Sequence, residues 1–295
     1  MSQTCPKCGA LADAEARFCE ACGARLRAET LAVQVDTSDD RVTLAPTREL
    51  AAVSDRGRVH ARNEDAVVLK TEPPFVILVV CDGVSTSHDA GLGSKAAAEA
   101  AAQYLLQGAA TSTNPAELMR GAILAGHAAT CALVPQDTSG DARPLTTIVA
   151  AFAKAGLVTI GWAGDSRAYI LSGSASRLLT HDDSWINWVV ARGNMTAFEA
   201  MRSPHAHAIT QCLGDPDDPP EPHVESVQLS SSDMLLLCSD GLWNYAPTPS
   251  ALNAVTSDLP TAAVEICETL VRYANNAGGR DNITAAIMMI DAAGV

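Results

Sequence analysis

No stretch of this sequence is apolar for long enough to cross a membrane. The longest apolar runs are Phe75–Cys81 and Met234–Cys238, whereas a membrane helix needs roughly 20 such residues. The segment Met1–Cys8 also lacks the apolar core of a signal peptide. We therefore expect a cytoplasmic protein that keeps its cysteines reduced and does not bind a membrane.

Basic residues are few as well. The chain has 20 Lys and Arg against 34 Asp and Glu, which gives a formal net charge of -14. A chain this acidic is a poor partner for nucleic-acid phosphates or anionic lipid, but its carboxylates can gather around metal cations. With 295 residues, 47% of them hydrophobic, it is long enough to bury a sizeable core.

Four of the nine cysteines lie within the first 22 residues. They form two C-x-x-C pairs, each followed by glycine, and this spacing suits a tetrahedral zinc site with four thiolate ligands. A segment this short cannot fold on apolar burial alone, so the metal would supply its folding energy. A redox-active dithiol pair is the alternative. The predicted ligands of one structural Zn²⁺ are Cys5, Cys8, Cys19 and Cys22.

These cysteines divide the chain into a small module and a large one. Residues 1–27 resemble the zinc ribbons that begin many bacterial proteins, and their nearly balanced charges favour docking of a protein over binding of nucleic acid. Residues 28–48 are mixed polar and lack a helical period, so we interpret them as a linker. The main domain is predicted over residues 49–292.

Strand-like and helix-like segments follow in groups within the main domain, which indicates α+β layers. Ser94 is the expected N-cap of an alanine-rich helix, and Asn114 caps another that begins with Pro115. Thr196 and Glu199 have the spacing of a capping box. Strands are expected at Ala66–Lys70, Phe75–Cys81, Thr146–Phe152, Leu157–Trp162, Arg167–Leu171, Val224–Leu229, Met234–Ser239 and Ile283–Ile290, and a further helix at Thr261–Ala274.

Acidic residues recur where the expected strands begin or end. Two apolar strands each end in an Asp-Gly pair, in which the strand is a rigid support for the carboxylate and the glycine permits a sharp turn. Clustered carboxylates repel one another unless cations lie between them, and oxygen ligands favour Mg²⁺ or Mn²⁺. Each position alone is also typical of an ordinary turn. The acidic candidates are Glu64, Asp65, Asp82, Asp240 and Asp281.

Seven segments, taken in order, resemble the motifs of the metal-dependent Ser/Thr protein phosphatases, the type 2C family. One such motif is weak evidence, whereas seven in the family order over about residues 50–291 are specific. The segments are Ser54–Asp65, Cys81–Gly83, Thr146–Thr147, Gly164–Tyr169, Leu179–Ser184, Ser239–Trp243 and Arg280–Thr284.

The resemblance implies a four-layer αββα sandwich, in which helices flank a central antiparallel β-sandwich. It also implies a binuclear Mg²⁺ or Mn²⁺ centre at one end of the sandwich. Asp82 would bridge the two ions, and Asp240 and Asp281 would complete one of them. The carbonyl of Gly83 would help to hold the other.

The resemblance implies a chemistry too. Glu64 and Asp65 would order metal-bound waters, and Asn282 would either support the metal ligands or form part of a turn. A water activated by the two ions would attack phosphorus in line, so no covalent phospho-enzyme is needed. The predicted catalytic residues are Asp65, Glu64 and Asp82.

Two positions depart from the family pattern. His60 stands where the family commonly has a phosphate-binding arginine, and Arg58 and Arg62 flank it. An arginine matches phosphate geometry better than a neutral histidine does, so all three are candidates for phosphate contact. Bacterial members use an aspartate shortly before the Thr pair for a third metal ion. Asp141 is the candidate here, one residue out of register.

We therefore expect a protein-serine/threonine phosphatase that acts on phosphorylated proteins and is opposed by a Ser/Thr kinase. The alternative is a degenerate phosphatase domain that serves as a phosphoprotein-binding or scaffold module. The missing arginine favours the alternative, whereas the presence of every principal metal carboxylate favours the enzyme. The acidic balance argues against binding of nucleic acid.

Overall fold

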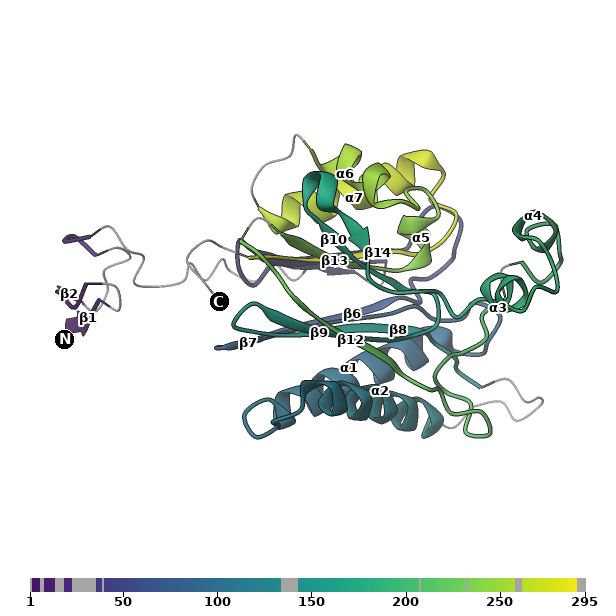
Figure 1. Ribbon diagram of the computed structural model, residues 1–295, viewed down its shortest axis with the longest axis horizontal. Coiled ribbons are helices and arrows are strands. Elements are labelled where there is room, and N and C mark those ends of the chain that lie inside the picture. Colours follow the sequence, from purple (N-terminus) through teal and green to yellow (C-terminus); the bar gives the residue numbers. More distant parts are fainter. Residues whose placement is uncertain are drawn as a thin grey trace.

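The computed structural model describes residues 2–5, 8–13, 19–22, 36–38, 40–133, 143–206, 208–231, 233–257 and 262–290. Its main domain consists of two antiparallel β-sheets packed face to face, with helices on both outer faces (Figure 1). This confirms the predicted four-layer αββα sandwich. Within the described ranges, none of the helices has the length and apolar character that crossing a bilayer requires.

Every strand pair in the two sheets is antiparallel. The seven-stranded sheet has the spatial order β11 (Arg177–Leu178), β10 (Arg167–Leu171), β13 (Met234–Cys238), β14 (Ile283–Met289), β5 (Leu50–Asp55), β4 (Arg41–Leu44) and β3 (Asp36–Ser38). The five-stranded sheet has the order β12 (His223–Gln228), β9 (Leu157–Ala163), β8 (Ile148–Lys154), β7 (Phe75–Cys81) and β6 (Ala66–Glu72).

Strand β7 shows why some strands are apolar throughout. Leu78 and Val80 point into the core between the two sheets, whereas Ile77, Val79 and Cys81 point into the core beneath helices. A strand whose two faces are both covered has no polar side. Burial of each large aliphatic side chain stabilises the fold by about 1.5–3 kcal/mol.

The helices form the two outer layers. Helices α1 (Ala90–Gly108) and α2 (Pro115–Cys131) cover the five-stranded sheet. The seven-stranded sheet is covered by α5 (Asp240–Trp243), α6 (Pro249–Thr256) and α7 (Ala263–Ala277). Helices α3 (Trp185–Ala191) and α4 (Ala197–Ala200) extend beyond one end of the sandwich (Figure 1). A short 3-10 turn, Gly173–Ala175, precedes β11.

Two expected helix starts are confirmed and one was wrong. The Asn114 side chain accepts hydrogen bonds from the first-turn amides of α2, and Thr196 and Glu199 form the capping box of α4. Helix α1 begins at Ala90, one turn before the expected cap Ser94. Ser94 is buried, and its hydroxyl donates to the carbonyl of Glu64 at 2.5 Å. It therefore ties the helix to a loop instead of capping it.

The linker expected over residues 28–48 was wrong in its second half. Strand β3 pairs with β4, and β4 pairs with β5. These two short strands extend the edge of the seven-stranded sheet, so the sheet of the main domain begins before residue 49. Mixed polar residues suit this edge, because an edge strand is covered on fewer sides than a central one.

The N-terminal module contains one hairpin of two short strands, β1 (Ser2–Thr4) and β2 (Leu11–Asp13). The Cys5 amide donates to the Ala10 carbonyl at 2.8 Å, and the Gly9 amide donates to the Cys5 carbonyl at 2.9 Å. Gly9 has a φ of 74°, a conformation that glycine adopts without strain. The hairpin thus bends the chain around the first C-x-x-C pair.

Candidate metal centre

Asp82 directly follows β7 and is held by its backbone. The Thr146 hydroxyl donates to the Asp82 carbonyl at 2.8 Å, and the Asp82 amide donates to the Thr147 hydroxyl at 3.2 Å. The Thr147 amide donates to the same carbonyl at 2.8 Å. With its main chain fixed on both sides, the carboxylate is left to face the end of the sandwich. This explains the function of the Thr pair.

Gly83 is required by the packing behind Asp82. A Cβ atom at this position would lie 2.7 Å from the carbonyl oxygen of Glu64 and 2.9 Å from Ala90. Both contacts are closer than real Cβ atoms adopt, so the loop before β6 and the start of α1 can approach only a glycine. The tight packing holds Glu64 next to Asp82 in space.

Asp65 is fixed through one carboxylate oxygen. Its Oδ2 accepts hydrogen bonds from the Ser239 hydroxyl at 2.7 Å and the Thr284 hydroxyl at 2.6 Å. Its Oδ1 is buried and has no hydrogen-bond partner. An unpartnered buried carboxylate oxygen is costly, and a cation or an ordered water on that side would relieve the cost.

Asp240 and Asp281 lie on the seven-stranded sheet. Asp240 begins α5 immediately after β13, and its Oδ2 accepts from the Asn244 side chain at 3.1 Å. Asp281 precedes β14, and its Oδ1 accepts from the Asn282 amide at 2.8 Å. Strands β13 and β14 are neighbours, so two segments about 40 residues apart in sequence present their carboxylates at the same end of the sheet.

Asn282 holds the loop before β6 in place. Its side-chain oxygen accepts from the Glu64 amide at 2.8 Å, and its side-chain nitrogen donates to the carbonyls of Arg56 and Arg62 at 2.8 and 3.0 Å. The side chain is almost fully buried, so all of these bonds form away from solvent. Asn282 therefore positions the Glu64–Asp65 segment against Asp281.

The buried carboxylates at this end of the sandwich raise one another's pKa. Burial raises the pKa of Asp65 to about 7, and the charges of Asp240 and Asp281 act in the same direction. Burial, together with these neighbours, also raises the pKa of Asp82 well above its usual range. Divalent cations would remove this repulsion, so the residues fit a centre for hard cations. Asp82, Gly83, Asp165, Asp240 and Asp281 line the cavity, whose volume is about 230 Å³.

Asp165 was missed as a site residue. It lies in the turn between β9 and β10 and lines the same cavity. Burial raises its pKa to about 7, and the charges of Asp240 and Asp182 add to the effect. The sequence carried a signal, because Asp165 belongs to one of the seven recognised segments. Its place beside Asp240 depends on the pairing of β10 with β13, which no local pattern reveals.

The three candidates for phosphate contact differ in their surroundings. His60 is half-buried, and its Nε2 lies 3.2 Å from Asp281 Oδ1. Arg58 is exposed and donates to the side chain of Asn276 on α7 at 3.2 Å. Arg62 is exposed and close enough for its charge to lower the pKa of Glu64, although burial leaves that pKa raised. Asp141, the candidate for a third metal ion, lies outside the described residues.

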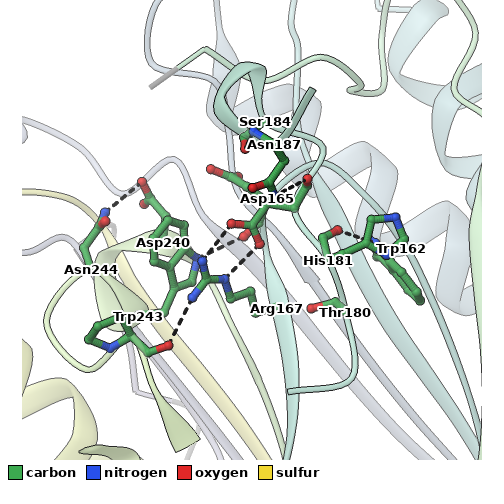
Figure 2. Close-up of polar contacts among 12 residues, drawn as sticks. Trp162, Asp165, Arg167, Thr180, His181, Ser184, Asn187, Asp240, Trp243 and Asn244 are labelled. Carbon is green, nitrogen blue, oxygen red and sulfur yellow. Dashed lines mark hydrogen bonds and ion pairs between the residues drawn. The ribbon is translucent and has the colours of Figure 1, made fainter. Parts of the chain in front are cut away.

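A second pocket, of about 460 Å³, lies between the carboxylates and helices α3 and α4. Arg167 lines it and forms a two-pronged ion pair with Asp182, at 2.9 and 2.7 Å. Its guanidinium also stacks on the Trp243 ring, 3.7 Å from the centroid. Figure 2 shows Asp240 and Trp243 on one side of Arg167 and His181 on the other. The stacked ion pair thus forms one wall of the pocket.

The four N-terminal cysteines come together in the hairpin module. The Cys5 and Cys22 sulfurs are 3.6 Å apart, as are those of Cys8 and Cys19. All four sulfurs lie within 4.8 Å of one another. Tetrahedral Zn–S bonds of about 2.3 Å require sulfur separations of about 3.8 Å. The geometry fits a single zinc ion bound by four thiolates.

Comparison with known families identifies both modules of the chain. The family described as protein phosphatase 2C matches residues 56–285. The chain belongs to the protein phosphatase 2C family. A zinc-ribbon domain matches residues 4–26, which covers all four clustered cysteines.

Relatives and solved structures support the same assignment. Protein phosphatase PhpP of Streptococcus pneumoniae is 43% identical over 128 residues, covering 43% of this chain and 51% of PhpP. The chain therefore spans about half the length of PhpP. The Streptococcus agalactiae serine/threonine phosphatase has a TM-score of 0.70 and 27% identity, covering 82% of this chain and 99% of its own. The catalytic domain of the phosphatase PstP, solved with 2 manganese ions, has a TM-score of 0.64 and 27% identity. The match covers 82% of this chain and 97% of the PstP domain.

Proposed function

We propose that this protein is a metal-dependent protein-serine/threonine phosphatase that hydrolyses phosphoserine and phosphothreonine at a binuclear Mg²⁺ or Mn²⁺ centre. The observation that carries the proposal is the cavity lined by Asp82, Asp240 and Asp281, whose carboxylates repel one another without cations. The manganese ions bound by PstP, a relative of the same fold, support the choice of ion.

We assign the ligands as the family resemblance predicts them. Asp82 would bridge the two ions, Asp240 and Asp281 would complete one, and the Gly83 carbonyl would contribute to the other. Carboxylate and carbonyl oxygens are the donors that Mg²⁺ and Mn²⁺ prefer. Glu64 would bind through ordered water, since its carboxylate lies beside Asp281 and burial raises its pKa.

When bound, the ions would activate a water as the nucleophile and neutralise the phosphoryl oxygens. The protein's part is to position that water and the substrate. The Ser239 and Thr284 hydroxyls hold Oδ2 of Asp65, which leaves its buried Oδ1 to orient the attacking water or accept its proton. His60, Arg58 and Arg62 are the candidates to bind the substrate phosphate, and the contact of His60 with Asp281 favours His60.

The substrates we propose are phosphorylated proteins, which implies an opposing Ser/Thr kinase. The pocket beside Arg167 and Met201 adjoins the metal cavity, because Asp165 and Asp240 line both. It offers a peptide chain a place next to the reacting phosphate. The described residues that line the metal cavity all belong to the main domain, so we propose that the zinc ribbon docks a protein partner.

The test is hydrolysis of a phosphoserine or phosphothreonine peptide, and of p-nitrophenyl phosphate, by the full chain with Mn²⁺. We expect Asp82→Ala and Asp240→Asn to lower kcat/KM by roughly 10³-fold or more, because each loses a ligand that stabilises charge in the transition state. Asp217→Asn, in an exposed turn, is the matched control and should retain full activity.

The alternative is a degenerate domain that binds phosphoproteins without hydrolysing them. It is favoured by His60 in place of the usual arginine. Wild-type protein that binds Mn²⁺ poorly in calorimetry and leaves the phosphopeptide intact would support the alternative and overturn the phosphatase. Mn²⁺-dependent release of phosphate, lost in Asp240→Asn, would exclude it.

A further inference from the structure

A second group of metal-binding side chains lies outside the carboxylate centre. One nitrogen each of His181 and His223 and one oxygen of Asp183 all lie within 4.8 Å of one another. His181 and Asp183 precede α3, whereas His223 begins β12, about 40 residues later in sequence. None of the three lines the metal cavity, and Figure 2 shows His181 on the side of Asp165 away from Asp240.

The carboxylate of this group is held in place from behind. Asp183 Oδ2 accepts a hydrogen bond from the Gly164 amide at 3.0 Å, and the Asp183 amide donates to the Gly164 carbonyl, also at 3.0 Å. The side chain is buried. Its other oxygen, Oδ1, faces His223 Nε2 at 2.9 Å. One oxygen is therefore anchored to the protein and the other is presented to the imidazole.

The two imidazole rings are positioned by a tryptophan. The His223 ring stacks on Trp162 at a centroid distance of 5.1 Å, and His181 meets the same ring edge-on at 5.2 Å. The Trp162 indole is itself fixed, because its N–H donates to the His181 carbonyl at 2.9 Å. Such outer contacts orient the ligands of metal sites in proteins. The two imidazole rings then lie 4.4 Å apart, tilted by 66°.

The donor set and spacing suit zinc. His223 Nε2 and Asp183 Oδ1 are 2.9 Å apart. If an ion lay about 2.05 Å from each atom, the angle between the two bonds at the ion would be about 90°. Two imidazoles and one carboxylate are ligands that Zn²⁺ binds, with a fourth position left open for water. Mg²⁺ prefers all-oxygen sites, so this site and the carboxylate centre select different metals.

We propose that His181, Asp183 and His223 form a binding site for Zn²⁺ that is separate from both the ribbon and the carboxylate centre. The ion would join the segment that leads into α3 to the edge strand β12. Asp182, the ion-pair partner of Arg167, lies between His181 and Asp183 in the sequence. Occupancy of the site would thus stabilise the base of α3 and one wall of the adjoining pocket.

The test is a calorimetric titration of the full chain with Zn²⁺, with the ribbon already loaded and Mg²⁺ in large excess. We expect one further Zn²⁺ to bind to wild type, and His181→Ala to weaken that binding by at least about 10–100-fold, since even supporting residues have effects of this size. His181 is exposed, so the variant should fold. His205→Ala, which removes a ring that contacts Trp185 instead, is the matched control.

Two further measurements locate the ion. Asp82→Asn should retain the extra Zn²⁺, because Asp82 is not a ligand of the proposed site. His223→Asn should lose the extra Zn²⁺, because it removes one of the three ligands. Anomalous scattering at the zinc edge should place the ion between His181 and His223. Equal Zn²⁺ affinity in wild type and His181→Ala, or loss of the extra ion in Asp82→Asn, would overturn the proposal.

Discussion

The zinc ribbon and the carboxylate centre are both metal sites, but they are built in opposite ways. The ribbon draws its four ligands, Cys5 to Cys22, from 18 consecutive positions. The ligands proposed for the carboxylate centre run from Asp82 to Asp281, and strand pairing in two sheets brings them together. In the ribbon, metal binding would supply the free energy of folding. In the main domain, strand pairing would bring the ligands together before any metal binds.

This difference decides which residues can be changed without harm. Beside the ribbon's cysteines, a short hairpin supplies the only regular structure among the described residues of that module. The carboxylates of the main domain are surrounded by hydroxyls, amides and an asparagine that fix them before any ion arrives. Residues that touch no ion should therefore matter more in the carboxylate centre.

Asn282 gives the strongest test of this idea. Asn282→Ala removes three hydrogen bonds to the loop that carries Glu64, and we expect Mn²⁺ affinity and kcat/KM to fall about 10–100-fold. High Mn²⁺ should restore part of the activity, because the ligands themselves remain. Asn276→Ala, which removes only the exposed bond to Arg58, is the control. Wild-type Mn²⁺ affinity in Asn282→Ala would show that the loop needs no support.

The family resemblance placed Asn282 beside the proposed ligands, as a supporting or turn residue, but it did not give the hydrogen bonds that Asn282 makes. Sequence order identified the five acidic candidates and the Asp-Gly pairs, because each lies in a short recognisable segment. It could not show that one amide bonds to three backbone groups about 220 residues away. Such contacts arise from the pairing of β14 with β5, which is a property of the whole sheet.

The fold, like the site, was predicted where the sequence carries strong local signals and not where it depends on distant contacts. Long apolar segments such as β7 and well-capped helices such as α2 were found, because burial on two faces and Asn-Pro caps leave strong local signals. The edge strands β3 and β4 were interpreted as linker, since both are short and rich in polar residues, and β4 has one buried residue. The start of α1 was placed one turn late, because Ser94 resembles a cap but bonds to a distant carbonyl.

His60 stands where the family commonly has a phosphate-binding arginine, and its replacement tests whether it binds the substrate phosphate. If it binds the substrate phosphate, His60→Ala should raise KM for a phosphopeptide about tenfold or more, the loss expected for a hydrogen bond to a charged group. Arg58→Ala should leave KM nearly unchanged, because that side chain is engaged with Asn276. An unchanged KM in His60→Ala, with a raised one in Arg62→Ala, would transfer the role to Arg62.

Asp165 tests whether the fold holds repelling carboxylates without metal. Its pKa of about 7 exceeds the value of about 3.9 in an unfolded chain, so the folded state binds more protons between these pH values. The stability of the metal-free protein should therefore fall as pH rises from about 4 to 7. Asp165→Asn stays neutral and should be more stable than wild type above about pH 7, on the order of 1–3 kcal/mol.

Urea unfolding of the metal-free protein, followed by tryptophan fluorescence, measures this difference, since all four tryptophans lie in the main domain. Below about pH 3 the two proteins should unfold at nearly the same urea concentration, because Asp165 is then protonated in both the folded and the unfolded state. Saturating Mg²⁺ should shrink the advantage of the variant at neutral pH. Parallel stability curves for the two proteins across this range would show that Asp165 carries no repulsion.

The smallest effect is expected on turnover when the zinc site of the ribbon is removed, because the two metal sites should act independently. Cys5→Ser combined with Cys22→Ser removes one close sulfur pair and should abolish zinc binding by the ribbon, measured as one zinc fewer per chain. Turnover of p-nitrophenyl phosphate with Mn²⁺ should change by less than about twofold, because the described residues that line the metal cavity all lie in the main domain. Glu20→Gln, between the cysteines of the ribbon, keeps all four thiolates and serves as the control. A large loss of turnover in the double variant would mean that the ribbon supports the carboxylate centre, and the two sites would then have to be treated as one unit.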